Sequence, residues 1–136
     1  MTQFRFSEHS VKHLATCDVR LQQLAFALIQ HVDFRVLEGH RTLARQKELH
    51  EQGFTKVLKG KHNEYPSKAF DLLPVPVNLD EMSVWKDKPR FFQFAGFVRG
   101  VASELRIPIR HGGDWDSDFN YAEHSFLDLP HFELVE

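Results

Sequence analysis

The sequence is poor in cysteine, since Cys17 is the only one among 136 residues. A single cysteine excludes an intrachain disulfide, so folding does not depend on an oxidising compartment. It also excludes a zinc site built from thiolates. Any metal must therefore be held by histidine and carboxylate side chains.

The chain also lacks long apolar runs and an excess of basic residues. The longest apolar run near the N-terminus, residues 24–29, is too short to span a bilayer, and the opening residues lack the pattern of a signal peptide. The 17 Lys and Arg stand against 19 Asp and Glu, for a net charge of -2. We therefore expect a soluble cytoplasmic product with no membrane insertion and no nucleic-acid partner.

Phenylalanine and histidine are plentiful, at 13 and nine residues. So many phenylalanines predict a core built on aromatic packing. The length suits one domain and is enough to bury a core without disulfides. We expect a single domain over residues 1–136, with no room for a second one.

Helix and strand signals mix along the chain without regular alternation. Asp18 and Thr42 have the residue types of helix N-caps, and Pro89 suits the first turn of a helix that runs to about residue 105. Residues 34–37, 69–73, 107–110 and 126–134 read as strands, and residues 54–68 as a long loop. This order predicts a small α+β domain with helices packed on an antiparallel sheet.

Candidate metal ligands occur at three places. Asp71 lies in an otherwise apolar strand, where a buried carboxylate is costly unless it is paired or bound to a metal. His131 alternates with Phe132 in the last apolar segment, and His62 lies in the long loop. Two histidines and one carboxylate would leave one position of a tetrahedral zinc open, which is typical of a catalytic site. Taken singly, each residue could equally be a surface or paired core residue.

Four segments carry a resemblance to a known family. EGHRTLARQKELHEQG, GKHNEYPSKAFDLLPVP, HGGDWD and FLDLPHFEL occur in this order within residues 7–136. The combination resembles the phage L-alanyl-D-glutamate endopeptidases, which belong to the D-alanyl-D-alanine metallopeptidase group. The group's fold is a small α+β domain around an antiparallel sheet.

The resemblance implies a site and a substrate. The positions that match the family's zinc ligands are His62, Asp71 and His131, and Asp128 matches its catalytic carboxylate. Arg41 matches the arginine that contacts the substrate or the developing oxyanion, and Gln46 and Ser67 match weaker candidates for substrate contact. The implied substrate is the peptidoglycan stem peptide. The resemblance implies an endolysin that consists of a single catalytic domain over residues 1–136, without a separate cell-wall-binding domain. Such an enzyme accumulates in the host cytoplasm until the membrane is permeabilised.

Two departures from the group's pattern affect what the resemblance implies. His62 and Asp71 are nine positions apart, a longer separation than in much of the group, which favours the phage enzymes over the dipeptidases. His111 stands where a tryptophan is common, which affects the shape of the substrate groove.

Two other functions remain open. A D-alanyl-D-alanine carboxypeptidase would share the same ligands and base. A non-catalytic zinc module that binds wall peptides would have no need of Asp128, so the presence of this residue argues against it. We expect a monomer in each case.

The segment before the last strand alternates oxygen donors at Asp114, Asp116 and Asp118. Such alternation resembles the start of a calcium-binding loop. However, Phe119 occupies the position where that loop wants glycine, and no glutamate closes it. A solvated acidic loop is therefore favoured over a calcium site.

Overall fold

The computed structural model describes residues 4–75, 81–120 and 127–136. Its sheet contains β1 (Phe34–Glu38), β2 (Ala69–Pro74), β3 (Ile109–His111) and β4 (His131–Leu134), in the spatial order β1-β2-β4-β3. Every neighbouring pair is antiparallel. The predicted α+β fold with an antiparallel sheet is confirmed.

The first two helices begin at side-chain caps. Helix α1 (Glu8–Leu14) follows Ser7, whose hydroxyl accepts from the Ser10 amide at 3.1 Å. Helix α2 (Val19–Ile29) follows Asp18, whose carboxylate accepts from the Arg20 amide at 2.9 Å. Each cap satisfies an amide that would otherwise have no partner in the first turn.

The remaining helices follow β1 in the chain. Helix α3 (Leu43–Glu51) is capped by Thr42, and the 3-10 turn η1 (Lys61–Asn63) lies in the expected long loop. Helix α4 (Glu81–Lys86) was not expected from the sequence, and α5 (Lys88–Glu104) follows it directly. Asp87 caps α5, and Pro89 lies in its first turn as predicted.

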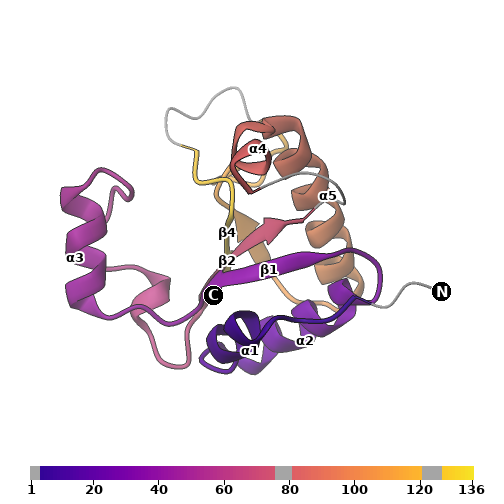
Figure 1. The fold of residues 1–136 in the computed structure, drawn as a ribbon, viewed down its shortest axis with the longest axis horizontal. Coiled ribbons are helices and arrows are strands. Elements are labelled where there is room, and N and C mark those ends of the chain that lie inside the picture. Colours follow the sequence, from indigo (N-terminus) through magenta and orange to yellow (C-terminus); the bar gives the residue numbers. More distant parts are fainter. Residues whose placement is uncertain (1–3, 76–80, 121–126) are drawn as a thin grey trace.

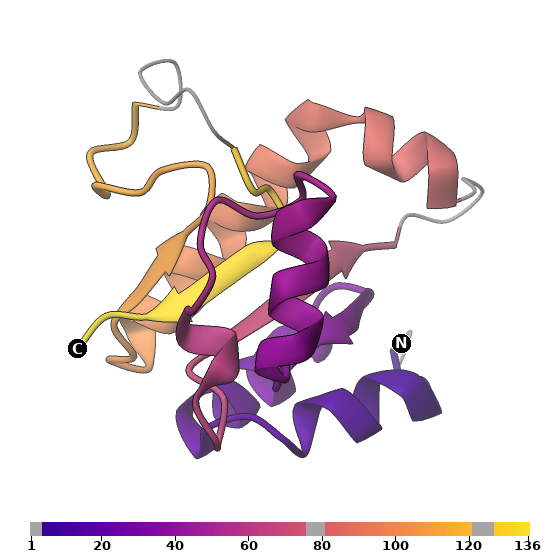
Figure 2. The same ribbon diagram turned by 90° about the vertical axis from the view of Figure 1, so that its left-hand side faces the viewer.

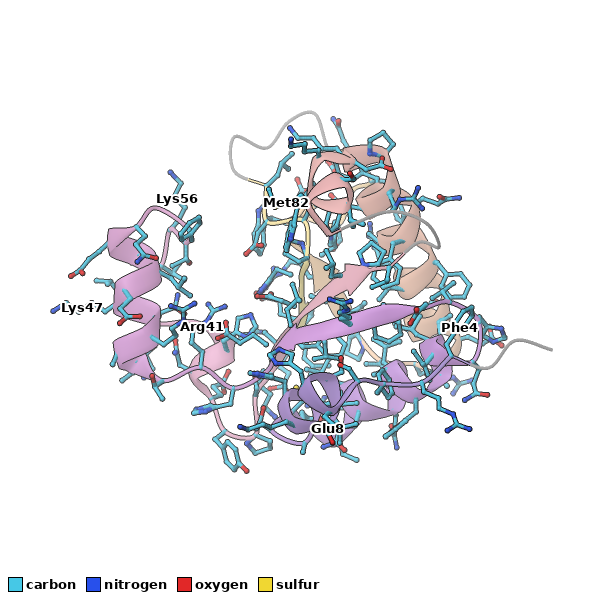
Figure 3. All side chains as sticks on the ribbon, in the orientation of Figure 1. Phe4, Glu8, Arg41, Lys47, Lys56 and Met82 are labelled. Carbon is cyan, nitrogen blue, oxygen red and sulfur yellow. The ribbon has the colours of Figure 1, made fainter. Side chains whose placement is uncertain are left out.

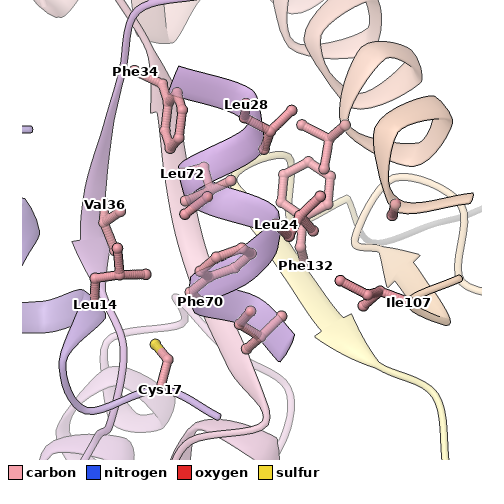
Figure 4. Packing of buried hydrophobic residues seen from close by; sticks show 14 of the residues in the cluster. Leu14, Cys17, Leu24, Leu28, Phe34, Val36, Phe70, Leu72, Ile107 and Phe132 are labelled. Atoms are coloured by element: carbon pink, nitrogen blue, oxygen red, sulfur yellow. The ribbon is translucent and has the colours of Figure 1, made fainter. Parts of the chain in front are cut away.

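The helices divide between the two faces of the sheet. Helices α2 and α5 cover one face, whereas α3 stands apart from the sheet on the other side (Figures 1 and 2). The core between α2, α5 and the sheet contains Phe70, Leu72 and Phe132 together with Leu24 and Leu28, all fully buried (Figure 4). Strand alternation puts the polar neighbours of these residues on the opposite face, toward α3.

Two strand boundaries differ from the prediction. Strand β3 begins only at Ile109, because Arg106 adopts a left-handed conformation with φ of 59° after the end of α5. Strand β4 begins only at His131, because the chain turns between Asp128 and His131. The start of that predicted strand, Phe126, lies outside the described residues.

None of the helices in the described ranges combines the length and the apolar character that a membrane span requires.

Candidate active site

The register between β2 and β4 brings two of the predicted ligands together. Asp71 pairs directly with His131, and Glu38 of β1 pairs with Asp71 on the other side. Residues opposite each other on neighbouring strands share a face and hold their Cβ atoms close. The flanking pair of Phe70 and Phe132 points the other way, into the core. The alternation of polar and apolar residues therefore places a row of ionisable groups on the face toward α3.

His62 reaches this row from η1 rather than from a strand. Its Nδ1 lies 2.7 Å from the backbone oxygen of Gly39, which fixes Nδ1 as the protonated nitrogen and leaves Nε2 as an electron-pair donor. Gly39 must be glycine here, since a Cβ atom would lie 2.5 Å from both the His13 carbonyl oxygen and the Thr16 hydroxyl. The turn is also held by the Arg41 amide, which donates to the His62 carbonyl oxygen at 2.7 Å.

The three predicted ligands form a triangle of electron-pair donors. His62 Nε2 lies 3.1 Å from Asp71 Oδ1 and 3.2 Å from His131 Nδ1, and the last two atoms are 3.4 Å apart. Ligands about 2.0 Å from a tetrahedral ion are roughly 3.3 Å from each other. The triangle therefore has the size of three corners of a tetrahedral metal site. In the described part of the chain, these residues form one of two groups that could hold a metal ion.

The charges around the triangle support the binding of a cation. Burial raises the pKa of Asp71, but the interactions of its carboxylate with His62 and His131 outweigh burial and hold that pKa well below its usual range. Burial lowers the pKa of His131, and hydrogen bonds to Asp71 and Glu133 overcome this and raise it to about 10. A positive charge is thus favoured among these side chains, and a metal ion would supply it in place of the His131 proton.

Glu133 orients His131, a role that the sequence analysis did not assign. Its carboxylate lies 2.8 Å from His131 Nε2, so Nε2–H donates to Glu133 and Nδ1 faces the triangle. Arg110 donates to the same carboxylate at 2.9 Å. Burial raises the pKa of Glu133, but these two partners lower it to about 2. A carboxylate behind a ligating histidine fixes the ring and its tautomer; the alternation of Glu133 with Phe132 was the available signal.

Asp128 is held beside the triangle by a turn and by His111–Gly113. The His131 amide donates to the Asp128 carbonyl oxygen at 3.1 Å, and the Asp128 amide donates to Gly112 at 2.8 Å. A Cβ atom at Gly112 would overlap the Asp128 backbone. Burial, and then the charge of Asp71, raise the pKa of the Asp128 carboxyl to about 6.

His111 is hydrogen-bonded to the same turn, between Asp128 and His131. It is fully buried, and its Nε2 lies 2.7 Å from the carbonyl oxygen of Leu129. Its Nδ1 accepts from the Gly113 amide at 3.3 Å. Burial lowers the pKa of His111 to about 4, so the ring is neutral at pH 7. The histidine that replaces the group's common tryptophan thus fixes the backbone next to Asp128.

Arg41 lies between α3 and the sheet (Figure 3). It is 8% exposed, and its guanidinium donates to Glu38 at 2.6 Å and to Asp71 Oδ2 at 3.3 Å. Asp71 therefore contacts the arginine with one oxygen and the two histidines with the other. This arrangement places a fixed positive charge next to the triangle.

Two clefts meet at Arg41 and Asp128, which line both of them. The apolar cleft has a volume of about 590 Å³, and its apolar side chains are Leu37, Leu49, Phe54, Trp85, Phe91, Leu127, Leu129 and Pro130. The lysine cleft has a volume of about 460 Å³ and is lined by Lys56, Lys59, Lys61, Trp115, His62 and His131. The ligand triangle thus lies where a long substrate could cross from one cleft to the other.

Comparison with known proteins agrees with this geometry. The family model for the phage L-alanyl-D-glutamate peptidase matches residues 1–135. The chain belongs to this family. The L-alanyl-D-glutamate peptidase of Escherichia phage T5 is 29% identical over 139 residues, covering 97% of this chain and 98% of that enzyme. The resemblance stated from the motifs is confirmed.

A solved structure of the same kind shares the fold. The crystal structure of the Serratia marcescens L-Ala D-Glu endopeptidase ChiX superposes with a TM-score of 0.71 and 27% sequence identity. The match covers 98% of this chain and 91% of ChiX. The small α+β fold is therefore one that such a peptidase adopts.

The two residues predicted to contact substrate lie in different surroundings. Gln46 lines the lysine cleft but is only 2% exposed, and its amide is hydrogen-bonded to Arg41 and to the backbone of Val57. Ser67 is fully buried beside the backbone of Ala69 and lines neither of the two clefts. The structure thus brings Gln46 to the site through Arg41 and leaves Ser67 outside it.

The acidic loop forms the second group of possible metal ligands in the described chain. Carboxylate oxygens of Asp114, Asp116 and Asp118 all lie within 4.8 Å of one another. Asp114 is fully buried and already accepts from Arg99 at 2.9 Å and from the Phe119 amide at 2.9 Å. The guanidinium of Arg99 therefore already places a positive charge beside Asp114. Calcium binding stays a prediction, and the absence of heat on calorimetric titration with calcium would dismiss it.

Proposed function

We propose that this protein is a zinc metallopeptidase that hydrolyses the L-alanyl-D-glutamate bond of peptidoglycan stem peptides and so lyses the bacterial wall. The observation that carries the proposal is the triangle of His62, Asp71 and His131 at the junction of two clefts. Membership of the phage L-alanyl-D-glutamate peptidase family supports the choice of bond.

The donor set favours zinc as the metal. Two imidazole nitrogens and one carboxylate oxygen, spaced as corners of a tetrahedron, are the ligands that catalytic zinc takes. When bound, the ion would supply an acidified water and a Lewis acid for the scissile carbonyl. Because such ligands also accept other divalent ions, metal analysis of the purified protein is the direct test.

Asp128 is the residue that moves protons. Its carboxyl has a pKa raised to about 6, close to the value at which a group can accept a proton and then release it near neutral pH. The turn from Asp128 to His131 keeps this carboxyl near the ligands. Asp128 would take the proton of the attacking water and pass it to the leaving amine of D-glutamate.

Arg41 stabilises the negative charge that develops on the carbonyl oxygen. Its contacts with Glu38, Gln46 and Asp71 fix the plane of the guanidinium before substrate arrives. Five N–H groups are available to a guanidinium, so these contacts leave capacity for the oxyanion. A preorganised donor of this kind is often worth about 3 kcal/mol in the transition state.

Residues 1–136 would act as one catalytic domain and as a monomer, held in the host cytoplasm until the membrane is permeabilised. The main hydrophobic core supports the single-domain proposal, since it joins α2, α5 and the sheet. Size-exclusion chromatography with light scattering tests the monomer. Fractionation of infected cells before lysis tests the location.

Mass spectrometry of purified peptidoglycan after digestion, with and without a chelator, tests the activity. Intact glycan strands and released peptides that begin at D-glutamate are the expected products, and the chelator should abolish them. Release of free D-alanine alone would establish the carboxypeptidase instead. No product in either condition, with zinc bound, would contradict both peptidases and leave the wall-peptide-binding module standing.

A further inference from the structure

The two clefts offer different chemistry to the two halves of a substrate that crosses the triangle. Asp71 lines the apolar cleft, whereas His62 and His131 line the lysine cleft. A peptide that crosses the triangle from one cleft to the other would place the residues before the scissile bond in one cleft and those after it in the other.

The lysine cleft carries the greater positive charge. Its lining includes Arg41 and three lysines against two carboxylates, those of Asp128 and Glu133. Arg110 and His131 already neutralise Glu133. In the apolar cleft the balance is reversed, because two arginines face the three carboxylates of Glu38, Asp71 and Asp128. An anionic group would thus be bound more strongly in the lysine cleft.

Lys56 and Lys59 are the lysines placed to meet such a group. Both are exposed in the segment after α3, and both line the lysine cleft. Lys61 has another role, since its ammonium donates to the backbone oxygen of Leu134. In Figure 3, Lys56 lies on the segment that follows α3, whereas Lys47 lies on the outer side of that helix.

Gln46 ties the lysine-bearing segment to the catalytic arginine. Its amide nitrogen donates to the Val57 carbonyl oxygen at 2.8 Å and to the Thr55 hydroxyl at 3.3 Å. Its amide oxygen accepts from Arg41 at 2.8 Å. The lysines are therefore held in a fixed relation to Arg41, which is what recognition of a group close to the scissile bond requires.

The two halves of the stem peptide differ in charge in the same way. The half that ends in L-alanine presents a methyl side chain and no charge near the scissile bond. The half that leaves as the amine begins with D-glutamate, which continues through its γ-carboxyl group. Its α-carboxylate is therefore free, on the carbon that bears the scissile nitrogen.

We infer that the lysine cleft, through Lys56 and Lys59, binds the free α-carboxylate of the D-glutamyl residue, while the apolar cleft takes the L-alanyl half. This inference rests on the proposed function, because it presumes the L-alanyl-D-glutamate bond. It fixes the direction of the substrate in the groove and requires a free carboxylate next to the cut bond.

Two synthetic stem peptides that differ at one group test the inference. One carries D-glutamate with a free α-carboxylate, and the other carries the α-amide. The wild type should cleave the acid with a kcat/KM about 10-fold or more above that of the amide, mainly through KM, since a charge-assisted contact is lost. The double variant Lys56→Met, Lys59→Met should lose this preference. Lys47→Met, on the outer side of α3, should keep it.

The outcomes separate the inference from the function. Equal cleavage of both peptides by the wild type would overturn the inference and leave the endopeptidase intact. Cleavage of neither peptide, with release of D-alanine from a pentapeptide, would overturn the proposed function itself. A double variant that keeps the preference would overturn the assignment to these lysines. The charge-preserving variant Lys56→Arg, Lys59→Arg should keep the preference, which excludes misfolding as the cause of its loss.

Discussion

The guanidinium of Arg41 donates a hydrogen bond to the amide oxygen of Gln46 at 2.8 Å. Both residues are buried, and the amide nitrogen of Gln46 is bonded to the segment after α3. A buried amide that uses both its oxygen and its nitrogen in this way orders the groups around it. Gln46 therefore holds Arg41 and the lysine-bearing segment in a fixed relation to each other.

Replacement of Gln46 by leucine should lower kcat about 10-fold while leaving the bound metal in place. The substitution removes one of the contacts that preorganise Arg41, and preorganised donors act mainly in the transition state. It also leaves buried polar groups without a partner, which should cost about 1–3 kcal/mol of stability. Steady-state kinetics and thermal unfolding measure the two effects. Gln52→Leu, at the exposed end of α3, is the matched control and should change neither.

Gly112→Ala should reduce activity strongly, because the added methyl group would overlap the backbone of Asp128. The turn that carries this residue must then move, and a shift of about 1 Å in a catalytic group can cost 100-fold in rate. The comparison is Gly100→Ala, on α5, where a Cβ atom meets nothing within 4 Å. That variant should keep full activity and gain about 0.5–1 kcal/mol of stability. Similar activity in the two alanine variants would show that the turn tolerates displacement.

Two of the three predicted ligands could be placed from local sequence patterns. Asp71 and His131 each alternate with core phenylalanines, so their faces follow from the period of a strand. Their direct pairing did not follow from it, because register depends on contacts between strands that are distant in the sequence. The place of His62 beside them did not follow from a period either, since it depends on the bond of its Nδ1 to the Gly39 carbonyl oxygen and on the Arg41 amide, which donates to the His62 carbonyl oxygen.

Features that depend on tertiary contacts were missed or displaced. Helix α4 is short, and it is held by packing of Val84 in a small cluster with Leu73 and Phe91 rather than by a periodic pattern. Strand β4 starts later than predicted because the turn at Asp128 interrupts an apolar run. Ser67 lines neither of the two clefts, and its hydroxyl donates to the Ala69 carbonyl oxygen, so its contact with substrate stays a prediction.

His111 should make the protein less stable as the pH falls from about 6.5 to about 4. Burial lowers its pKa from the ordinary value of 6.5 to about 4, so the native state binds fewer protons than the unfolded state in this range. Its stabilising effect is complete above the unfolded pKa and is lost toward the folded pKa. The contribution should amount to about 3 kcal/mol in the free energy of unfolding.

The variant His111→Gln isolates this contribution. Glutamine does not titrate and can still donate to the Leu129 carbonyl oxygen. Asp128, with its raised pKa, acts in the opposite direction, but it is present in both proteins and cancels in the difference. Chemical denaturation between pH 4 and pH 7 should show the wild type losing stability relative to the variant as the pH falls. A constant difference across this range would exclude His111 as the titrating group.

The separation of metal binding from proton transfer is tested by Asp128→Asn and His131→Ala. The asparagine amide keeps the size of the side chain but cannot accept the proton of water, so hydrolysis should fall by a factor of about 100 to 10,000. Zinc content should stay near one ion per chain, because the triangle is intact. His131→Ala removes a corner of the triangle and should lose both zinc and activity. Metal analysis alongside peptide cleavage gives both readings, and an Asp128→Asn protein without zinc would move Asp128 from the role of base to that of ligand.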